Sequence, residues 1–431
     1  MVRGRRQPTG LEDAISATLE KRRSQSTIRH LTTNDPTSVD FSSNDFLSLA
    51  SCEELRRIFL AELEAGPSGL GSGGSRLLDG NSGHAEHLER TIATFHNAPA
   101  GLLCNSGFDA NVGLYSCLPQ PGDVIIYDEF IHASVHDGMR LSRAGKCVAF
   151  AHNDVGALAA TIDDCIRSDP SLLQGRRNVF VAVETVYSMD GDIAPLKDMV
   201  DLVKDLLPNG NGHLIVDEAH STGIYGPKGA GLVCELGLED EITVRLHTFG
   251  KALACNGAIL LCSPLIRQYL VNYARPLIYT TFMSYPALAA IKASYRFLSD
   301  GKTVQRAENL RHLIRYLHNQ LLDLQERGPW RHHESETVHS LLRVPTECPQ
   351  SPIFSVLTSE PKALAAYCQS RGFVVRGIVP PTVPAGAERV RICLHAGNTD
   401  EQIDSLIVAI RGWVMQRLEV VKQEVQIRPR L

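Results

Sequence analysis

The chain has 431 residues, 43% of them hydrophobic and 21% charged, which is enough apolar sequence for one large core and a smaller one. A formal net charge of −5 gives no electrostatic basis for binding nucleic acid or an anionic membrane, and no apolar run is long enough to span one. The 11 cysteines form no CxxC pair, which is typical of free thiols in a reducing compartment and argues against a disulfide framework.

In chain order, residues 1–60 are predicted to form an N-terminal arm with one helix over residues 11–23. From about residue 85, short apolar runs alternate with segments long enough for helices, such as residues 155–167 and 196–207. The runs are rich in β-branched residues and cover residues 124–127, 147–151, 179–183, 214–216, 244–248 and 258–261. Strands separated by helices pair in parallel through right-handed crossovers, so residues 61–298 are predicted to form a large, mostly parallel α/β domain.

The pattern changes near residue 300. Apolar residues at spacings of three and four from Ala307 to Leu324 predict a long helix that ends at Gly328. Further apolar runs and two helix-length segments follow, at residues 340–344, 353–357, 362–370, 390–394 and from about residue 400. Residues 299–431 are therefore predicted to form a smaller α+β domain.

The clearest candidate for chemistry is an apolar run that ends in Asp217 and is followed by His220. Ligands of open α/β sheets bind at the carboxyl ends of strands. There Asp217 can pair with a protonated ring nitrogen, and His220 can donate to a phenolate oxygen. The alternative is that Asp217 only caps the next helix, and these residues alone leave both interpretations open.

Lys251 follows another apolar run, between Gly250 and Ala252. A partly buried lysine loses proton affinity and becomes a competent amine nucleophile for aldehydes. Taken singly, a lysine whose ammonium group reaches solvent at a strand end is the more frequent case.

Two weaker signals lie upstream, at Ser106–Gly107–Phe108 and at His132. The first triplet opens a predicted helix, whose free N–H groups and dipole suit a phosphate. His132 can stack on a flat ring, although a histidine satisfied within the core is more frequent. No strand precedes the glycine-rich residues 71–76, so they are no dinucleotide fingerprint, and no histidine or cysteine spacing predicts a metal site.

The order of the motifs resembles that of the α-oxoamine synthases, a branch of the fold-type I pyridoxal-phosphate (PLP) enzymes. SGF, HAS, ETVYSMDGD, DEAHSTG and TFGKA follow one another as in that family, and the resemblance runs from about residue 11 to the last predicted helix. It implies a fold-type I PLP-dependent transferase, with a large, mostly parallel α/β domain, a smaller C-terminal α+β domain, and pyridoxal 5′-phosphate as cofactor.

The resemblance also implies a role for each motif residue. Lys251 would hold the cofactor as a Schiff base, and Asp217 would keep the pyridine nitrogen protonated. His220 would hydrogen-bond the phenolic oxygen, and His132 would stack on the ring. The remaining cofactor-binding residues that it implies are Ser106, Gly107, Phe108, Glu184, Ser188, Thr248 and, across the interface of a homodimer with shared sites, Thr281.

On the substrate side, the resemblance implies that Arg391 grips the amino-acid carboxylate, because a guanidinium group binds both oxygens at once. Asn44 and Arg29 would flank the same pocket. The implied reaction is a decarboxylative condensation. The amino acid loses its α-proton to Lys251 and attacks an acyl thioester, and coenzyme A, carbon dioxide and an aminoketone are released.

Within the family, GSRLLDGN at residues 74–81 and PPTVPAG at 380–386 favour the branch that joins L-alanine to pimeloyl-CoA in biotin biosynthesis. One departure is Val379, where bacterial members commonly carry an arginine near the acyl site. A distal carboxylate is expensive to bury without a cation, and Arg376 is the candidate substitute.

Three alternatives stay open: an α-oxoamine synthase with an uncharged acyl-CoA donor, a PLP aminotransferase, and a non-catalytic regulatory subunit. The presence of Lys251 argues against the last. No early apolar stretch resembles a signal peptide, and the terminal Pro429-Arg430-Leu431 resembles a relaxed peroxisomal signal. The expected location is therefore peroxisomal, or cytoplasmic if that tripeptide is an ordinary chain end.

Overall fold

The computed structural model describes residues 9–25, 27–328, 330 and 340–427, and it divides into two compact units, residues 1–38 and 39–431. The first unit contains helix α1 (Gly10–Ser24), which agrees with the helix predicted there. A capping box starts α1: the Thr9 hydroxyl accepts from the Glu12 N–H, and the Glu12 carboxylate accepts from the Thr9 N–H. None of its side chains is buried within the described part of the chain.

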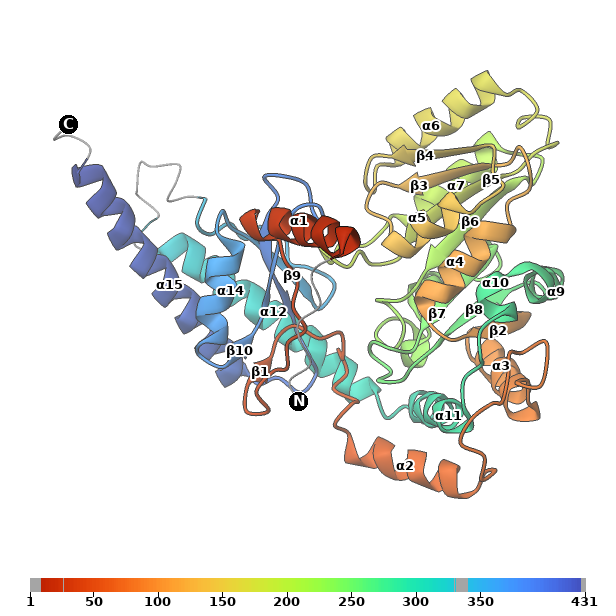
Figure 1. The fold of residues 1–431 in the computed structure, drawn as a ribbon, viewed down its shortest axis with the longest axis horizontal. Coiled ribbons are helices and arrows are strands. Elements are labelled where there is room, and N and C mark those ends of the chain that lie inside the picture. The colour runs from red at the N-terminus through yellow and green to blue at the C-terminus, as the bar shows by residue number, and fades with distance from the viewer. Residues whose placement is uncertain (1–8, 26, 329, 331–339, 428–431) are drawn as a thin grey trace. The chain divides into compact units, whose positions relative to one another are not determined.

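The second unit is built on a seven-stranded sheet in the order β2-β8-β7-β6-β5-β3-β4. Its strands are β2 (Ala100–Cys104), β3 (Val124–Asp128), β4 (Lys146–Phe150), β5 (Val179–Glu184), β6 (Gly212–Asp217), β7 (Val244–Thr248) and β8 (Ala258–Cys262). All neighbours pair in parallel except β8, which is antiparallel to both β2 and β7. The predicted mostly parallel α/β fold is confirmed, and Figure 1 shows β3, β5 and β6 side by side.

The two faces of this sheet bury alternate residues of each strand. Along β5, Val181 and Val183 belong to a core shared with α6 (Val155–Ser168) and α7 (Leu196–Leu206). Phe180 and Ala182 belong to the opposite core, which includes residues of α4 (Gly107–Cys117), α5 (Ala133–Arg140) and α9 (Pro264–Tyr273). Both faces are covered, which explains why the strands are continuous apolar runs.

Further helices surround this sheet or connect it to the rest of the unit. They are α2 (Glu53–Glu64), α3 (Gly83–Phe95), the 3₁₀ turn η1 (Pro227–Gly229), α8 (Leu232–Leu236), α10 (Arg275–Ile278) and α11 (Tyr285–Ser299). Buried residues of α3 and α11 pack with β2 and β8 in a third core. Within the seven-stranded sheet, β2 is the strand that we did not predict, because only the short pair Leu102-Leu103 marks it in the sequence.

Two small sheets follow. β9 (Ile353–Leu357), β11 (Arg376–Ile378) and β12 (Arg389–Cys393) pair antiparallel in the order β11-β12-β9. β1 (Val39–Asp40) pairs in parallel with β10 (Phe373–Val374). Their helices are α12 (Val304–Arg327), α14 (Pro361–Gln369) and α15 (Asp400–Ile427). The predicted run at residues 340–344 forms only an isolated bridge, from Arg343 to Leu357.

The seven-stranded sheet falls within residues 61–298 and the β9-β11-β12 sheet within 299–431, while the domain boundaries themselves stay a prediction. Among the described helices, none combines the length and the apolar character that crossing a bilayer requires.

Candidate active site

Lys251 lies in the turn between β7 and β8 and lines a cavity of about 880 Å³. Burial lowers the pKa of its amine, the carboxylates of Asp217 and Glu184 act against that, and the guanidinium of Arg391 adds to the lowering. A lysine in this setting gives up its proton more readily than a surface lysine. The structure therefore places Lys251 as an amine that can attack an aldehyde.

Asp217 is the last residue of β6, and it lies beside Glu184, the last residue of β5. Its Oδ2 accepts from the Asn111 amide at 2.9 Å, and its Oδ1 accepts from the Ala219 N–H at 2.9 Å. Burial and the charge of Asp217 raise the pKa of Glu184 well above its usual range. The neighbouring strands thus hold one fixed carboxylate and one carboxyl group at the same edge of the sheet.

Asn111 is a site residue that the sequence did not reveal. It lies on α4, and its amide nitrogen donates to both Asp217 Oδ2 and the Ser134 hydroxyl, each at 2.9 Å. The Ser134 hydroxyl in turn lies 2.7 Å from His132 Nδ1, which also accepts from the Ser134 N–H. The network fixes the orientation of the His132 ring. Of this network, the sequence motifs indicated only the part from His132 to Ser134, the HAS motif.

His220 and His132 both line the cavity. His220 is 4% exposed, and its Nδ1 has no hydrogen-bond partner in the described part of the chain. Burial, with the positive charges of Lys251 and Arg391, holds the pKa of His220 well below its usual range. The pKa of His132 is lowered by burial, while Asp217 acts to raise it. His220 is therefore a neutral ring with an unused nitrogen.

The start of α4 lies against the end of β7. A Cβ atom on Gly107 would come within 3.4 Å of Thr248 Cβ and Oγ1, so glycine permits this approach. Ser106 caps the helix: its hydroxyl accepts from the Asp109 N–H at 3.0 Å. Phe108 is 46% exposed. The first N–H groups of a helix lack internal partners, so this helix start can receive an anion.

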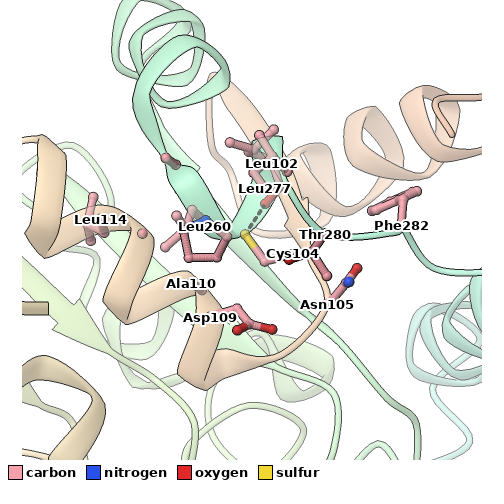
Figure 2. A pocket seen from close by; sticks show the side chains of 13 residues that line it. Leu102, Cys104, Asn105, Asp109, Ala110, Leu114, Leu260, Leu277, Thr280 and Phe282 are labelled. Atoms are coloured by element: carbon pink, nitrogen blue, oxygen red, sulfur yellow. Dashed lines mark hydrogen bonds between the residues drawn. The ribbon is translucent and has the colours of Figure 1, made fainter. Parts of the chain in front are cut away.

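A smaller cavity behind the helix start has a volume of only about 10 Å³ (Figure 2). Figure 2 shows Asn105 beside Thr280, and the Asn105 amide donates to the Thr281 carbonyl at 2.7 Å. Thr281 itself is exposed and does not line the large cavity. Its predicted place across a dimer interface therefore stays a prediction.

The substrate side is formed by β12 and two loops. Arg391 Nε donates to the Ser188 carbonyl at 2.7 Å, and its Nη2 donates to Asn44 Oδ1 at 2.9 Å. All three residues line the cavity. Arg29 is an exposed residue of the first unit, and its role stays a prediction.

The described residues contain no cluster of His, Cys, Asp and Glu suited to a metal ion. The cavity lining contributes an amine of lowered pKa and an imidazole with an unused nitrogen. The fixed carboxylate of Asp217 acts on that amine from outside the lining, and the start of α4 lies against the Thr248 hydroxyl. These are the groups that define a pyridoxal-phosphate site.

Residues 36–410 match the model of the family described as aminotransferase class I and II, and the chain belongs to that family. The chain is 54% identical over 417 residues to the 8-amino-7-oxononanoate synthase of Emericella nidulans, covering 96% of this chain and 98% of that relative. It is 40% identical over 391 residues to the aminoacyl transferase sphA of Aspergillus fumigatus, covering 89% and 82%.

A solved structure of serine palmitoyltransferase from S. paucimobilis, with bound PLP and myriocin, matches with a TM-score of 0.78 and 26% identity over 96% of this chain and 100% of that one. The protein is therefore a fold-type I, PLP-dependent acyltransferase, as the motif order predicted.

The geometry fits this cofactor. Lys251 would hold its aldehyde carbon, Asp217 the ring nitrogen, and the helix start with Thr248 the phosphate. The unpartnered Nδ1 of His220 is a buried polar atom that needs a partner, and the cofactor's phenolic oxygen would supply one. Glu184 does not line the cavity, but its buried carboxyl group interacts with the backbone of His132, which does. These individual roles stay predictions.

Proposed function

We propose that the protein condenses L-alanine with pimeloyl-CoA to give 8-amino-7-oxononanoate, coenzyme A and carbon dioxide, in biotin biosynthesis. The observation that carries the proposal is the 54% identity, over nearly the whole of both chains, to a fungal 8-amino-7-oxononanoate synthase. The site agrees with it, because an amine and an arginine, Lys251 and Arg391, line the same large, partly apolar cavity.

When bound, the cofactor draws electrons from the α-carbon of the amino acid, so that this carbon can lose a proton and form a bond to an acyl group. Arg391 orients the amino acid through its carboxylate. Lys251, of lowered pKa, takes the α-proton and later returns one. Asp217 holds the proton on the ring nitrogen, and Asn111 keeps the carboxylate in place.

The acyl chain would lie against residues 380–385, which line the cavity together with Phe130 and Ile131. Val379 follows β11, and neither Val379 nor Arg376 lines the cavity directly. Arg376 pairs directly with Arg391 in the β11-β12 register, and residues opposite one another in an antiparallel pair share a face. This supports Arg376 as the cation for a distal carboxylate.

The test compares pimeloyl-CoA with heptanoyl-CoA, which has the same chain length and lacks the distal carboxylate, with product identified by mass spectrometry. We expect a clear preference for pimeloyl-CoA. The second candidate is an uncharged acyl donor, which the mainly apolar wall at residues 380–385 and the structural match to serine palmitoyltransferase favour. Preference for heptanoyl-CoA would support that candidate. Transamination of alanine without acyl transfer would support an aminotransferase instead.

We also propose a homodimer. Large apolar side chains are exposed around the helix start and the α10 segment: Leu78 is 77% exposed, Tyr279 71% and Phe108 46%. A second copy that covers them would bring Thr281 to the partner's phosphate site. Light scattering should give twice the chain mass, and mixing inactive Lys251→Ala with inactive Thr281→Ala enzyme should restore part of the activity if sites are shared.

Peroxisomal location remains a proposal, because Pro429-Arg430-Leu431 lie outside the described residues. A fluorescent protein placed ahead of the last ten residues should become punctate, and should turn diffuse when Leu431 is deleted. A diffuse signal in both would favour the cytoplasm.

A further inference from the structure

His152, directly after β4, lies between two carboxylates that the mechanism above does not use. Its Nδ1 lies 2.8 Å from Asp128 Oδ1, and its Nε2 lies 2.6 Å from Asp192 Oδ2. Both partners only accept hydrogen bonds, so both ring nitrogens donate and the ring is an imidazolium. Burial acts to lower the pKa of His152, but the hydrogen bonds and charges of the two carboxylates outweigh it and raise the pKa to about 10.

The two carboxylates belong to two segments of the chain that each contribute residues to the cavity lining, 129–133 and 187–190. Asp128 ends β3 and begins the segment that reaches His132, and its Oδ1 also accepts from the Phe130 N–H at 2.9 Å. Asp192 closes the loop of residues 187–192 after β5. Asn153 reinforces the bridge, since its N–H donates to Asp128 Oδ2 at 2.9 Å and its amide to Asp192 Oδ2 at 2.6 Å.

Two aromatic rings of the cavity wall pack on His152. The Phe130 ring centroid lies 4.4 Å away at an interplanar angle of 31°, and the Tyr187 centroid lies 4.5 Å away at 89°. Phe130 and Tyr187 both line the cavity. A cation against the face of Phe130 attracts the ring, so His152 supports two aromatic residues of the cavity lining.

The loop of residues 187–192 carries this support to the substrate side. The Ser188 carbonyl accepts from Arg391 Nε at 2.7 Å, and Asp190 forms an ion pair with the buried Arg389. A displaced loop would move the carbonyl against which Arg391 is aligned. His152 thus lies at one end of a chain of contacts that ends at Arg391.

We propose that His152 is a positioning residue, whose imidazolium ties residues 128–132 to the loop 187–192 so that the cavity keeps its shape around the cofactor and Arg391 keeps its orientation. The proposed effect on cofactor binding depends only on the family's use of PLP. The proposed effect through Arg391 rests on the proposed function, because it requires that this arginine binds the amino-acid carboxylate.

The test uses holoenzyme with His152→Gln, with Asp192→Asn, and with both. The matched control is His213→Gln, a half-buried histidine at the start of β6 with its own partners, Asn178 Oδ1 at 3.2 Å and Thr243 Oγ1 at 3.3 Å. Cofactor release is followed by visible absorbance after dilution, and KM for alanine and kcat are measured at saturating cofactor. Circular dichroism shows whether each variant is folded.

We expect His152→Gln to release the cofactor about tenfold faster and to raise KM for alanine about tenfold, with a much smaller change in kcat, because a hydrogen bond to a charged group is lost without touching the reacting atoms. The double variant should be no worse than the worse single variant, since both substitutions break the same contact. His213→Gln should release the cofactor at the wild-type rate.

Cofactor release at the wild-type rate in folded His152→Gln enzyme would overturn the proposal, and so would additive effects in the double variant. If His152→Gln does not fold, Asp192→Asn, which keeps the shape and removes the charge, decides by the same measurements. Failure of the proposed function is distinguishable, because cofactor release does not depend on which amino acid or thioester the enzyme uses.

Discussion

The two sides of the cavity are built differently. On the cofactor side, the functional groups lie at strand ends and helix starts and are held by hydrogen bonds, as Asp217 is held by Asn111 and the Ala219 N–H. On the acyl side, the wall is the irregular segment of residues 380–385, which has no strand or helix of its own. Bond-making chemistry needs a few groups at fixed positions, whereas selection of a chain needs mainly a shape, which a loop can supply.

If this contrast holds, the largest effect comes from the amine itself. Lys251→Ala should fold, because the side chain is only half-buried and contributes no core packing, but turnover should fall by more than about 10³-fold, as general acid–base catalysis alone contributes 10²–10⁴. Borohydride should attach the cofactor to Lys251 in the wild type, as peptide mapping would show, and Lys197→Ala is the control on α7. Attachment at another lysine would contradict the assignment.

The next largest effect is expected from Asp217→Asn. The variant side chain has the same shape as the carboxylate but lacks the charge that stabilises a protonated ring nitrogen. We expect exchange of the α-proton of alanine with solvent to slow by about 10²–10³-fold, the cost of removing one preorganised electrostatic group. Exchange is measured by NMR in deuterium oxide, with the exposed Asp201→Asn as control. Near-normal exchange would show that Asp217 does not have this role.

The sequence predicted the cofactor side well, because its residues follow apolar runs whose ends meet at one edge of a parallel sheet. Lys251, Asp217 and His220 were identified in this way, and the structure brings all three to one cavity or its edge. Asn111 and His152 were missed, since nothing local marks them. Each acts through partners far away in the chain, 106 residues from Asn111 to Asp217 and 40 from His152 to Asp192.

The acyl side was predicted less well for a related reason. β11 ends at Ile378, so Arg376 belongs to a strand and Val379 does not. The position of Arg376 follows from its pairing with Arg391 in the β11-β12 register. This register depends on how distant strands pair, and the spacing of apolar residues in the sequence does not predict it. The segment at residues 340–344 is a second example: its apolar run resembles the runs that form strands, yet it forms a single isolated β-bridge and no strand.

Arg376→Ala tests the acyl side directly. If its guanidinium binds the distal carboxylate, KM for pimeloyl-CoA should rise about tenfold or more, the cost of a hydrogen bond to a charged group, while KM for heptanoyl-CoA should not change. Arg371→Ala is the control, because this exposed arginine lies shortly before Arg376 in the chain and does not pair with β12. An equal rise for both thioesters would assign Arg376 to structure instead of recognition.

A smaller effect is expected on the cofactor side from Asn111→Ala. Its amide serves Asp217 and Ser134 at once, so the variant loosens both the carboxylate and, through Ser134, the His132 ring. We expect kcat to fall by about three- to tenfold, the cost of one or two ordinary hydrogen bonds, with the cofactor still bound. The comparison is Gln120→Ala, because the Gln120 amide donates to the Leu118 carbonyl and to the Tyr269 hydroxyl and not to Asp217 or Ser134. Unchanged kcat would mean that β6 alone positions Asp217.

The last prediction concerns pH and the stability that His152 contributes. Its pKa is raised to about 10 in the folded protein, above the ordinary value of 6.5 that applies in the unfolded chain. Asp128 and Asp192 hold the proton. Glu129, which accepts from the His152 backbone N–H, and Tyr187, whose ring packs edge-on against the imidazole, are further titratable groups in contact with His152. Below pH 6.5 both states carry the proton, and the contribution is complete. As pH rises from 6.5 towards 10, only the folded state keeps the proton, and the contribution is lost.

The free energy of unfolding of wild type should therefore exceed that of His152→Gln by about 1.5–3 kcal/mol at pH 6, the range for hydrogen bonds to a charged group. The difference should shrink steadily towards pH 10 in urea titrations. A difference that stays constant over this range would mean that the ring is neutral throughout, and that its contacts stabilise the cavity walls without the charge.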